Sequence, residues 1–342
     1  MNILGIGSLC SRGYGVESLE KALNDGLAPQ CDSFLVDLDG ISDRTLLKKL
    51  RRADRFSKMS VLAAAAALQD SNVEDLSEIR VGILLSTAFG AHVTTFDFLD
   101  GIIDYGEANV SPTAFSNSVH NAAASYVASS LGIKGPTLTV SRFSFPFQSA
   151  LQLASAWLEQ GRCDYLLLGS IDQHGDVLDY LAKQKLPLAK DGVIKPFIFS
   201  PSETLPGEGA LFLLLGRGQP GYCAIDAVTT DFSSSAASPA DLTILDSAGF
   251  IKDESKLLQV LQSGEPVTSY TPLYGGLMTG AAFSVAAAAI TLRNQKIYAA
   301  PEQTNPHNLN IVTQTARSPV ETVRTLSCGC NGDVAAVILS KK

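Results

Sequence analysis

Residues 112–172 read PTAFSNSVHNAAASYVASSLGIKGPTLTVSRFSFPFQSALQLASAWLEQGRCDYLLLGSID, and this stretch decides the fold. Two short apolar runs, at 137–140 and 165–169, have the length and composition of buried strands. Ala- and Leu-rich segments of helical length, at 122–130 and 148–160, lie beside them. Strand and helix therefore alternate, which predicts a layered α/β fold.

The same alternation continues on both sides of this stretch. Further strands are predicted at 3–7, 81–86, 211–216, 223–228, 267–270, 311–313 and 334–339, and further helices at 57–69 and 280–294. A strand, a Gly- or Pro-marked turn and an Ala-rich helix occur in each half of the chain, which is a repeat signal. Since no Pro- or Gly-rich linker separates two modules, we expect a single domain over 1–342. It would consist of two similar halves, about 1–218 and 219–342.

Composition narrows the classes of function. The chain has 342 residues, a formal net charge of -8, and 18% charged residues, as in ordinary globular proteins. Nucleic acid and anionic membranes demand an accumulated basic surface, so neither is expected as a partner. Lys48, Lys49, Arg51, Arg52 and Arg55 form one basic cluster, which is either a solvated helix face or a docking patch for an acidic partner.

The cysteines and the N-terminal segment indicate the compartment. Six cysteines are scattered without metal-ligand spacing, and the first residues lack the charged and apolar regions of a secretory signal. The long apolar stretch 281–292 is shorter than the roughly 20 residues that a membrane span needs. We therefore expect a reduced, cytoplasmic protein with no metal site and no cofactor.

Several blocks, in fixed order along the chain, resemble β-ketoacyl synthases of the thiolase superfamily. They are the helix Arg-x-x-Asp-Arg-x-x-Lys at 51–58, Phe-Ser-x-Ser-Val-His-Asn at 115–121, Gly-Pro-x-x-Thr-Val at 135–140, the Gly-x-x-Asp strand at 161–172, Pro-Gly-Glu-Gly-Ala at 206–210 and a closing loop at 327–332. The resemblance spans nearly the whole chain. It implies a thiolase-like layered αβαβα fold.

This resemblance places the family's nucleophilic cysteine at Ser144. The family's chemistry needs a thiolate that accepts an acyl group and imidazoles that assist decarboxylation and stabilise an oxyanion. A serine hydroxyl is un-ionised at neutral pH unless a general base takes its proton. Ser144 would therefore need an activating base.

The other catalytic positions also depart from the family. Asp246 is the best counterpart of the first histidine, and no histidine occurs between His174 and His307. Thr271 takes the place of the catalytic lysine and Gly276 that of the second histidine. Because glycine offers no side-chain donor, acid or base, we expect no condensation by this chain alone.

Aromatic residues and the closing loop are candidates for a pocket and its gate. Phe143, Phe145 and Phe147 either pack in the core or fill a vestigial acyl pocket. Cys330 takes the place of the gating phenylalanine, and we expect it, with Cys328, to be a small buried hydrophobe rather than a redox pair.

A further segment, in the matched block 115–121, is a candidate interface. Its residues Ser116, His120 and Asn121 are expected near a dimer surface. We expect His120 to have a packing and hydrogen-bonding role there rather than a catalytic one.

Three functions remain open. The first is a non-catalytic subunit that resembles the chain-length factors of type II polyketide or aryl polyene systems, although many of those carry glutamine at the position of Ser144. It would form a heterodimer with an active ketosynthase, shape that subunit's acyl tunnel, and meet acyl carrier protein through it, as part of a β-ketoacyl carrier-protein synthase, an acyltransferase. The second is a Ser144-dependent acyltransferase or hydrolase. The third is a homodimeric acyl-binding scaffold.

Overall fold

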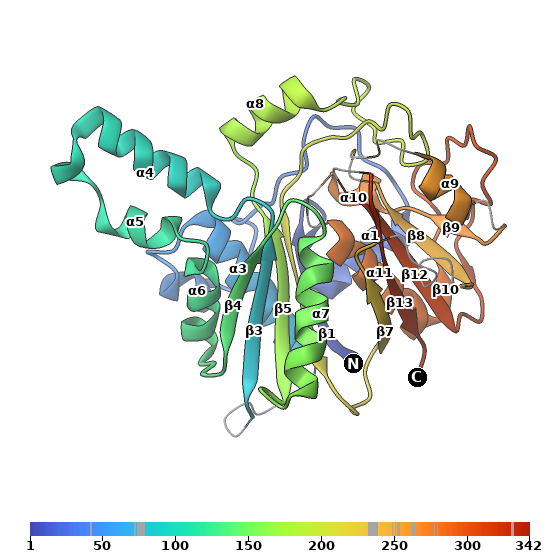
Figure 1. Cartoon of the computed structure of the whole chain (residues 1–342), viewed down its shortest axis with the longest axis horizontal. Coiled ribbons are helices and arrows are strands. Elements are labelled where there is room, and N and C mark those ends of the chain that lie inside the picture. The colour runs from blue at the N-terminus through green and yellow to red at the C-terminus, as the bar shows by residue number, and fades with distance from the viewer. Residues whose placement is uncertain are drawn as a thin grey trace.

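A computed structural model describes residues 1–41, 43–71, 73, 79–231, 239–247, 249, 251, 254–261, 264–276, 278, 280–329 and 332–342. Within these residues one large mixed sheet has the strand order β4-β3-β5-β6-β1-β7-β13-β12-β8-β9, and β2 pairs with the end of β1 (Figure 1). The strands are β1 (Asn2–Cys10), β2 (Gly13–Tyr14), β3 (Val81–Thr87), β4 (Thr137–Ser141), β5 (Tyr165–Asp172), β6 (Gly209–Gly216), β7 (Cys223–Thr229), β8 (Leu242–Asp246), β9 (Val267–Thr268), β12 (Thr322–Cys328) and β13 (Val334–Ser340). A separate small ribbon pairs β10 (Lys296–Ile297) with β11 (Ala316–Arg317).

The sheet repeats one plan twice. In chain order, the first five long strands are arranged third, second, fourth, fifth and first, and β7, β8, β9, β12 and β13 are arranged in the same way. In each set the second strand pairs in parallel with the third and fourth, while the fifth is antiparallel to the fourth and first. The two first strands, β1 and β7, join the sets through a short antiparallel pairing. The predicted α/β fold of two similar halves is confirmed, and we propose that the halves meet near residue 218, between β6 and β7.

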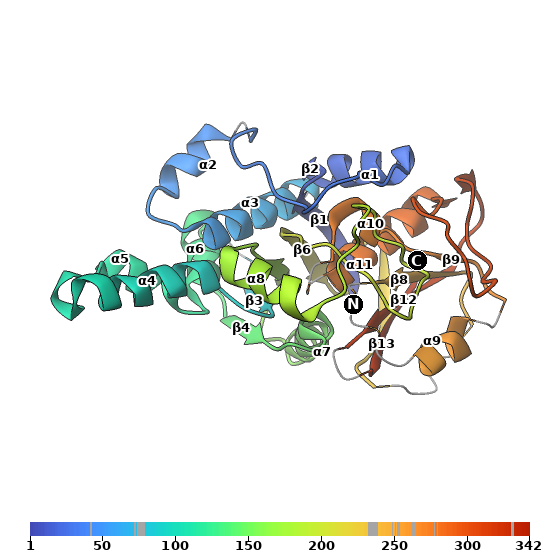
Figure 2. The same ribbon diagram turned by 90° about the horizontal axis from the view of Figure 1, so that it is seen from above.

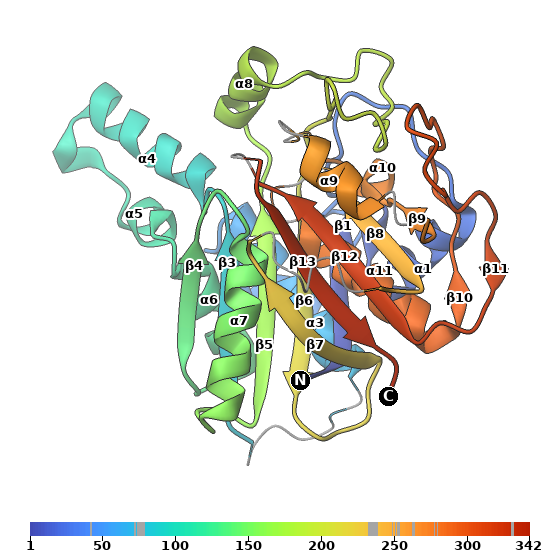
Figure 3. The same cartoon turned by 45° about the vertical axis from the view of Figure 1, so that its right-hand side comes forward.

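Helices pack on the outer faces of the two halves of the sheet and between them, which gives the molecule its layers. Helix α3 (Arg55–Asp70) and helix α6 (Ala122–Leu131) pack on the outer face of the first half, and helix α9 (Glu254–Leu261) packs on the outer face of the second. Helices α7 (Pro146–Glu159) and α11 (Gly280–Asn294) share one apolar core with strands of both halves, so they form the middle layer (Figures 1 and 3). The layering is therefore αβαβα.

Small residues permit this close layering. A Cβ atom on Gly7 of β1 would lie 2.0 Å from the carbonyl oxygen of Ala63 in α3, so only glycine fits there. Helix α11 is buried from Gly280 to Leu292 and is rich in alanine, which lets it pass between the two halves.

Two predictions about strands were wrong. Residues 311–313 form only an isolated bridge, from Ile311 to Val267, and the fourth strand of the second half is β12. The search for apolar runs did not predict β12, because this strand contains the charged residue Arg324. Arg324 is 1% exposed and donates to Thr243 Oγ1 (2.9 Å) and Glu265 Oε2 (2.6 Å). Strand β4 was predicted to be buried, but in the described part of the chain it is the half-exposed edge of the sheet and pairs with β3 alone.

The remaining helices lie at the periphery. They are α1 (Val16–Asp25), α2 (Arg44–Lys49), α4 (His92–Tyr105), a short 3-10 helix (Glu107–Asn109), α5 (Pro112–Ser118), α8 (Asp176–Lys185) and α10 (Thr271–Tyr274). Helices α4 and α5 form an arm that extends away from the body of the molecule (Figures 1 and 2). None of the helices in the described residues is long and apolar enough to cross a membrane.

Candidate functional site

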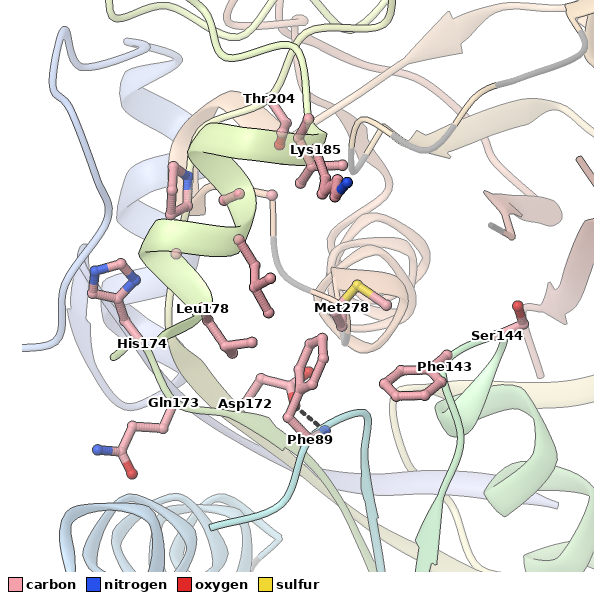
Figure 4. A pocket seen from close by; sticks show the side chains of 16 residues that line it. Phe89, Phe143, Ser144, Asp172, Gln173, His174, Leu178, Lys185, Thr204 and Met278 are labelled. Atoms are coloured by element: carbon pink, nitrogen blue, oxygen red, sulfur yellow. Dashed lines mark hydrogen bonds between the residues drawn. The ribbon is translucent and has the colours of Figure 1, made fainter. Parts of the chain in front are cut away.

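A cavity of about 490 Å³ lies where strand β5 ends and helix α8 begins (Figure 4). Its walls come from the loop before α7, the segment before β6 and the segment before α11, in addition to α8 itself. Ser144 and Gly276 both line it, so the fold brings together the two residues that the family resemblance assigns to the nucleophile and the second histidine. Most of the other lining side chains are apolar.

Ser144 is placed by a sharp turn between β4 and α7. It is half-buried, and the next residue, Phe145, caps helix α7 in the left-handed conformation, with φ 54° and ψ 46°. A bulky side chain rarely adopts this conformation, so surrounding contacts must hold it. The Phe145 ring is buried against Gly329, where a Cβ atom would approach it within 2.9 Å. The closing loop thus supports the turn that presents Ser144.

The three phenylalanines of this segment have different surroundings. Phe147 is fully buried in the core shared by the two halves, and Phe145 is buried against the closing loop. Phe143 is 63% exposed, lines the cavity, and has its ring centroid 5.4 Å from that of Phe89. Core packing therefore describes Phe147, whereas Phe143 stands beside Ser144 at the cavity (Figure 4).

Thr204 occupies the space beside Gly276. A Cβ atom on Gly276 would lie 1.9 Å from Thr204 Oγ1, and a Cβ atom on Gly249 would lie 2.5 Å from the Thr204 Cβ. Backbone hydrogen bonds to Pro187 and Ala189, both 3.0 Å, hold Thr204 between these two glycines. There is consequently no room for an imidazole at position 276.

Asp246 and Thr271 lie outside the residues that line the cavity, in a buried polar network. The backbone N–H of Ser247 donates to Thr271 Oγ1 at 3.0 Å, which places the two candidate positions side by side. Gln148 of α7 donates to Ser327 Oγ at 3.1 Å, and the Ser327 hydroxyl in turn donates to Asp246. Burial raises the pKa of Asp246 to about 7, and its Oδ1 has no hydrogen-bond partner among the described residues. The structure therefore joins these two positions to each other but separates them from Ser144's cavity.

Asp172 is a cavity residue that the sequence reasoning missed as a functional candidate. Its Oδ1 accepts hydrogen bonds from Thr87 Oγ1 (2.9 Å) and the Ala88 N–H (3.1 Å). Burial nevertheless raises the pKa of this carboxyl to about 7. Its position at the end of the matched Gly-x-x-Asp strand was the available signal. Thr204 carried no such signal, because only its packing against two distant glycines reveals it.

An ion pair joins two of the matched blocks. Glu208, which is 1% exposed, accepts from Arg55 Nε at 3.2 Å and also from Arg55 Nη2. The backbone N–H groups of Val36 (2.9 Å) and His174 (3.2 Å) donate to the same carboxylate. Arg55 therefore belongs to this pair, while Lys48, Lys49, Arg51 and Arg52 are exposed. The Glu208 contact with His174 fixes the chain just before α8.

The candidate interface residues lie on the surface, away from the cavity lining. Ser116, His120 and Asn121 are exposed, next to the exposed apolar residues Phe115 and Val119. The His120 ring packs against Gly90, where a Cβ atom would approach it within 2.9 Å. Their role in an interface stays a prediction.

The closing loop contains two cysteines, Cys328 and Cys330. Cys330 lies outside the described residues. Cys328 is partly buried against the core of the second half, and desolvation raises the pKa of its thiol to about 12. Among the described residues, no three His, Cys, Asp or Glu side chains are grouped so that they could hold a metal ion.

Comparison with known sequences identifies the family. The model of the β-ketoacyl synthase N-terminal domain matches residues 10–220. Nodulation protein E of Rhizobium leguminosarum bv. trifolii is 25% identical over 222 residues, which are 61% of this chain and 55% of that protein. The 3-oxoacyl-[acyl-carrier-protein] synthase 2 of Staphylococcus aureus (strain N315) is 25% identical over 211 residues, 59% of this chain and 51% of that protein. The matches thus cover about half the length of these curated relatives.

Solved structures agree in fold. A β-ketoacyl synthase from Burkholderia phymatum STM815 superimposes with a TM-score of 0.83 at 16% identity, covering 99% of this chain and 98% of that one. The ishigamide ketosynthase/chain length factor gives a TM-score of 0.80 at 16% identity, again covering 99% and 98%. At such identity the likeness shows the fold, which is thiolase-like as predicted. Together with the family match over 10–220, it shows that the chain belongs to the β-ketoacyl synthase family.

Proposed function

We propose that this chain is a non-catalytic, chain-length-factor-like subunit that pairs with an active ketosynthase and shapes its acyl tunnel in type II polyketide or fatty-acid-like biosynthesis. The observation that carries the proposal is the pair Gly276 and Thr204. Gly276 has no side chain, and Thr204 Oγ1 fills the space where one would begin. A condensing enzyme needs a donor or base at this place, so the packing itself supports a chain adapted to a role without catalysis.

The other family positions agree with this. The hydroxyl of Ser144 replaces a thiol, and Asp246 and Thr271 lie in a buried network away from the cavity lining. A carboxyl and a hydroxyl with those contacts offer no imidazole to a thioester at Ser144. The polar groups that remain there support the fold.

An edge strand and exposed apolar side chains on the first half support a pairing surface there. Strand β4 is the edge of the sheet, and an edge strand offers unpaired backbone groups to another strand. Leu138 of β4 is 44% exposed, and Phe143 follows it. The arm adds further exposed apolar side chains, namely Phe96, Leu99, Ile103, Tyr105, Phe115 and Val119. Exposed apolar residues gathered in this way are typical of a protein interface.

The partner chemistry follows from homology and charge. Members of one family pair readily through equivalent surfaces, which favours an active ketosynthase as the other subunit. Among the similar structures, one is described as a type II PKS acyl-carrier protein in complex with its ketosynthase. A formal net charge of -8 disfavours docking of an acidic carrier on this chain, so we assign that contact to the partner.

Co-purification tests the proposal. The tagged chain is co-expressed with a ketosynthase that carries an intact cysteine and two histidines, and the ratio of the two subunits in the eluate is measured. Leu138→Asp, which puts a charge on the exposed edge, should lower that ratio. Leu27→Asp, at a residue 68% exposed on the loop after α1, is the matched control and should leave it unchanged.

Product length is the second readout. Bulk placed at the cavity mouth by Phe143→Trp should shift the chain length that the paired enzyme makes. A stable homodimer that never binds the synthase, with no effect on product length, contradicts the proposal and favours the homodimeric acyl-binding scaffold instead.

A second candidate function is favoured by one observation. Ser144 and Asp172 line the same cavity, and burial raises the pKa of Asp172 to about 7, which suits a general base. Ser144 could then accept an acyl group. Intact-mass measurement after incubation with acyl thioesters decides this, because an acyl adduct that is lost in Ser144→Ala but kept in Ser141→Ala would support the acyltransferase.

A further inference from the structure

One face of helix α4 in the arm has an apolar stripe that the rest of the described chain leaves exposed. The stripe consists of Phe96, Leu99 and Ile103, which follow one another at helical spacing and are 40%, 44% and 79% exposed. Another side of the helix faces α5, where the ring centroids of Phe98 and Phe115 lie 5.5 Å apart. Large apolar side chains on one exposed helix face are typical of a surface that meets another protein.

Hydrogen bonds fix the base of the arm to the body of the molecule. Thr94 Oγ1 donates to Oδ2 of Asp54, the N-cap of α3, at 2.7 Å. Asn117 donates to the carbonyl oxygen of Arg52 at 2.8 Å. These contacts lie near the start of α4 and the end of α5, whereas the apolar stripe lies further out along the arm (Figure 2). Substitutions on the stripe therefore leave these two contacts in place.

The charged side chains of α4 that lie beside the apolar stripe are all acidic. Asp97, Asp100 and Asp104, the acidic stripe, each follow one member of the apolar stripe in sequence, and all three are exposed. None of them forms an ion pair within the described residues. Interfaces place complementary charges opposite one another. A surface that fits this face of α4 is therefore apolar with basic side chains at its border.

A second copy of this chain does not supply such a surface through the same patch. An isologous dimer uses the same residues on both subunits. Residues 81–133, which include the arm, contain no Lys or Arg, so two copies that pair through their arms and β4 edges would bring acidic surfaces together. Like charges placed together at an interface disfavour the complex. The exposed basic residues Lys48, Lys49, Arg51 and Arg52 lie on α2 and just after it, outside that patch.

We propose that the acidic stripe selects the partner of this chain. Helix α4 docks on an apolar surface of a ketosynthase that is bordered by lysine or arginine side chains, and the same carboxylates keep two copies of this chain apart. The inference rests on the proposed function, which supplies the ketosynthase, and adds the charge that its surface must have. Charges at the border of an interface act mainly on the association rate, and salt screens them.

Association rates test the inference. The full chain is mixed with the ketosynthase used for co-purification, at about 0.05 M and about 0.5 M NaCl. The unaltered chain should associate about ten-fold more slowly at the higher salt concentration. The triple variant Asp97→Asn/Asp100→Asn/Asp104→Asn should already associate about ten-fold more slowly at the lower one, and salt should change its rate little.

A control variant and the chain alone complete the test. Asp25→Asn/Asp226→Asn/Glu321→Gln removes the same charge at exposed residues outside the arm and should keep the fast, salt-dependent association. In sedimentation velocity without synthase, the unaltered chain should be monomeric at low salt, whereas the triple asparagine variant of the stripe should self-associate. Adding Ile103→Asp to that variant should return it to a monomer, because the apolar stripe then holds a charge.

The outcomes separate this inference from the proposed function. An association rate that neither salt nor the stripe variant changes would overturn the inference while the pairing itself stands. A stable homodimer of the unaltered chain at low salt, in which the acidic stripe meets the basic cluster of a second copy, would also overturn it. If the chain binds no ketosynthase at either salt concentration, the proposed function fails, and sedimentation of the chain alone still decides whether the stripe keeps two copies apart.

Discussion

Replacing Gly276 with alanine measures how completely Thr204 fills the site. The new Cβ would lie 1.9 Å from Thr204 Oγ1 and 3.2 Å from the Leu205 carbonyl oxygen. Gly276 is not among the glycines with positive φ, so alanine meets no backbone strain and the whole cost is steric. Thr204 is β-branched, 2% exposed and tied at its backbone on both sides, so it has little freedom to turn away. Overpacking of this kind lowers the free energy of unfolding by about 1–3 kcal/mol.

A double-mutant cycle gives the assay. The free energy of unfolding is measured by urea denaturation for Gly276→Ala, Thr204→Ala and the pair. Thr204→Ala removes a hydroxyl for which the described part of the chain offers no hydrogen-bond partner, so it should cost little alone and should recover about 1–2 kcal/mol of the Gly276→Ala loss. Thr204→Val keeps a methyl group at the place of Oγ1 and should recover nothing. If Gly276→Ala is as stable as the unaltered chain, or if the two alanine substitutions are additive, the filled-site reasoning is refuted.

Three further predictions concern buried groups. Glu208→Gln should lower the free energy of unfolding by about 2 kcal/mol. The ion pair with Arg55 is lost, and the NH₂ group of the new glutamine faces a hydrogen-bond donor where a carboxylate oxygen accepted before. Phe147→Ala should cost about 3–5 kcal/mol, since it empties a fully buried site in the core. Asp246→Asn should change the pH dependence of stability. The pKa of Asp246 is about 7 in the folded chain and 3.8 in its ordinary state, so between these pH values the folded state binds more protons than the unfolded state. The stability of the unaltered chain therefore falls as pH rises from about 4 to 7, by up to about 1.4 kcal/mol per pH unit.

Each of these has a control measured in the same way. Glu321→Gln removes an exposed ion pair with Lys341 and should stay within about 0.5 kcal/mol of the unaltered chain. Phe143→Ala, at a 63% exposed ring, should cost far less than Phe147→Ala. For Asp246→Asn, unfolding curves at pH 5 and pH 8 should show the variant gaining relative to the unaltered chain at the higher pH. Tyr274 and Cys328 are the titratable groups beside Asp246, and parallel pH profiles for the two proteins would contradict the prediction.

The strands of the first half could be predicted from the sequence because each is marked by its own run of apolar residues. Strands β3, β5 and β6 are buried along almost their whole length, and nearly continuous apolar runs predict such strands. Strand β4 has a similar composition but lies at the edge of the sheet, a difference that depends on what stands beside it. Composition predicts that a segment is a strand, but it does not predict which strands lie beside it in the sheet.

The second half was harder to predict because distant partners stabilise it. Arg324 sits in the middle of β12, where a charged residue argues against a buried strand. Its guanidinium is satisfied by Thr243, 81 residues away in sequence, and Glu265, 59 residues away. A pattern within one short segment cannot reveal contacts of this kind.

Motifs in fixed order along the chain were enough to predict the family, and they also assign Ser144, Thr271 and Gly276 to catalytic positions, which stays a prediction. How those positions relate in space could be seen only in the folded chain. It brought Ser144 and Gly276 to one cavity, set Asp246 and Thr271 in a separate network, and filled the space beside Gly276 with Thr204. The physical reason is that motifs fix residue types and order, while the volume left for a side chain depends on atoms that approach from elsewhere in the fold.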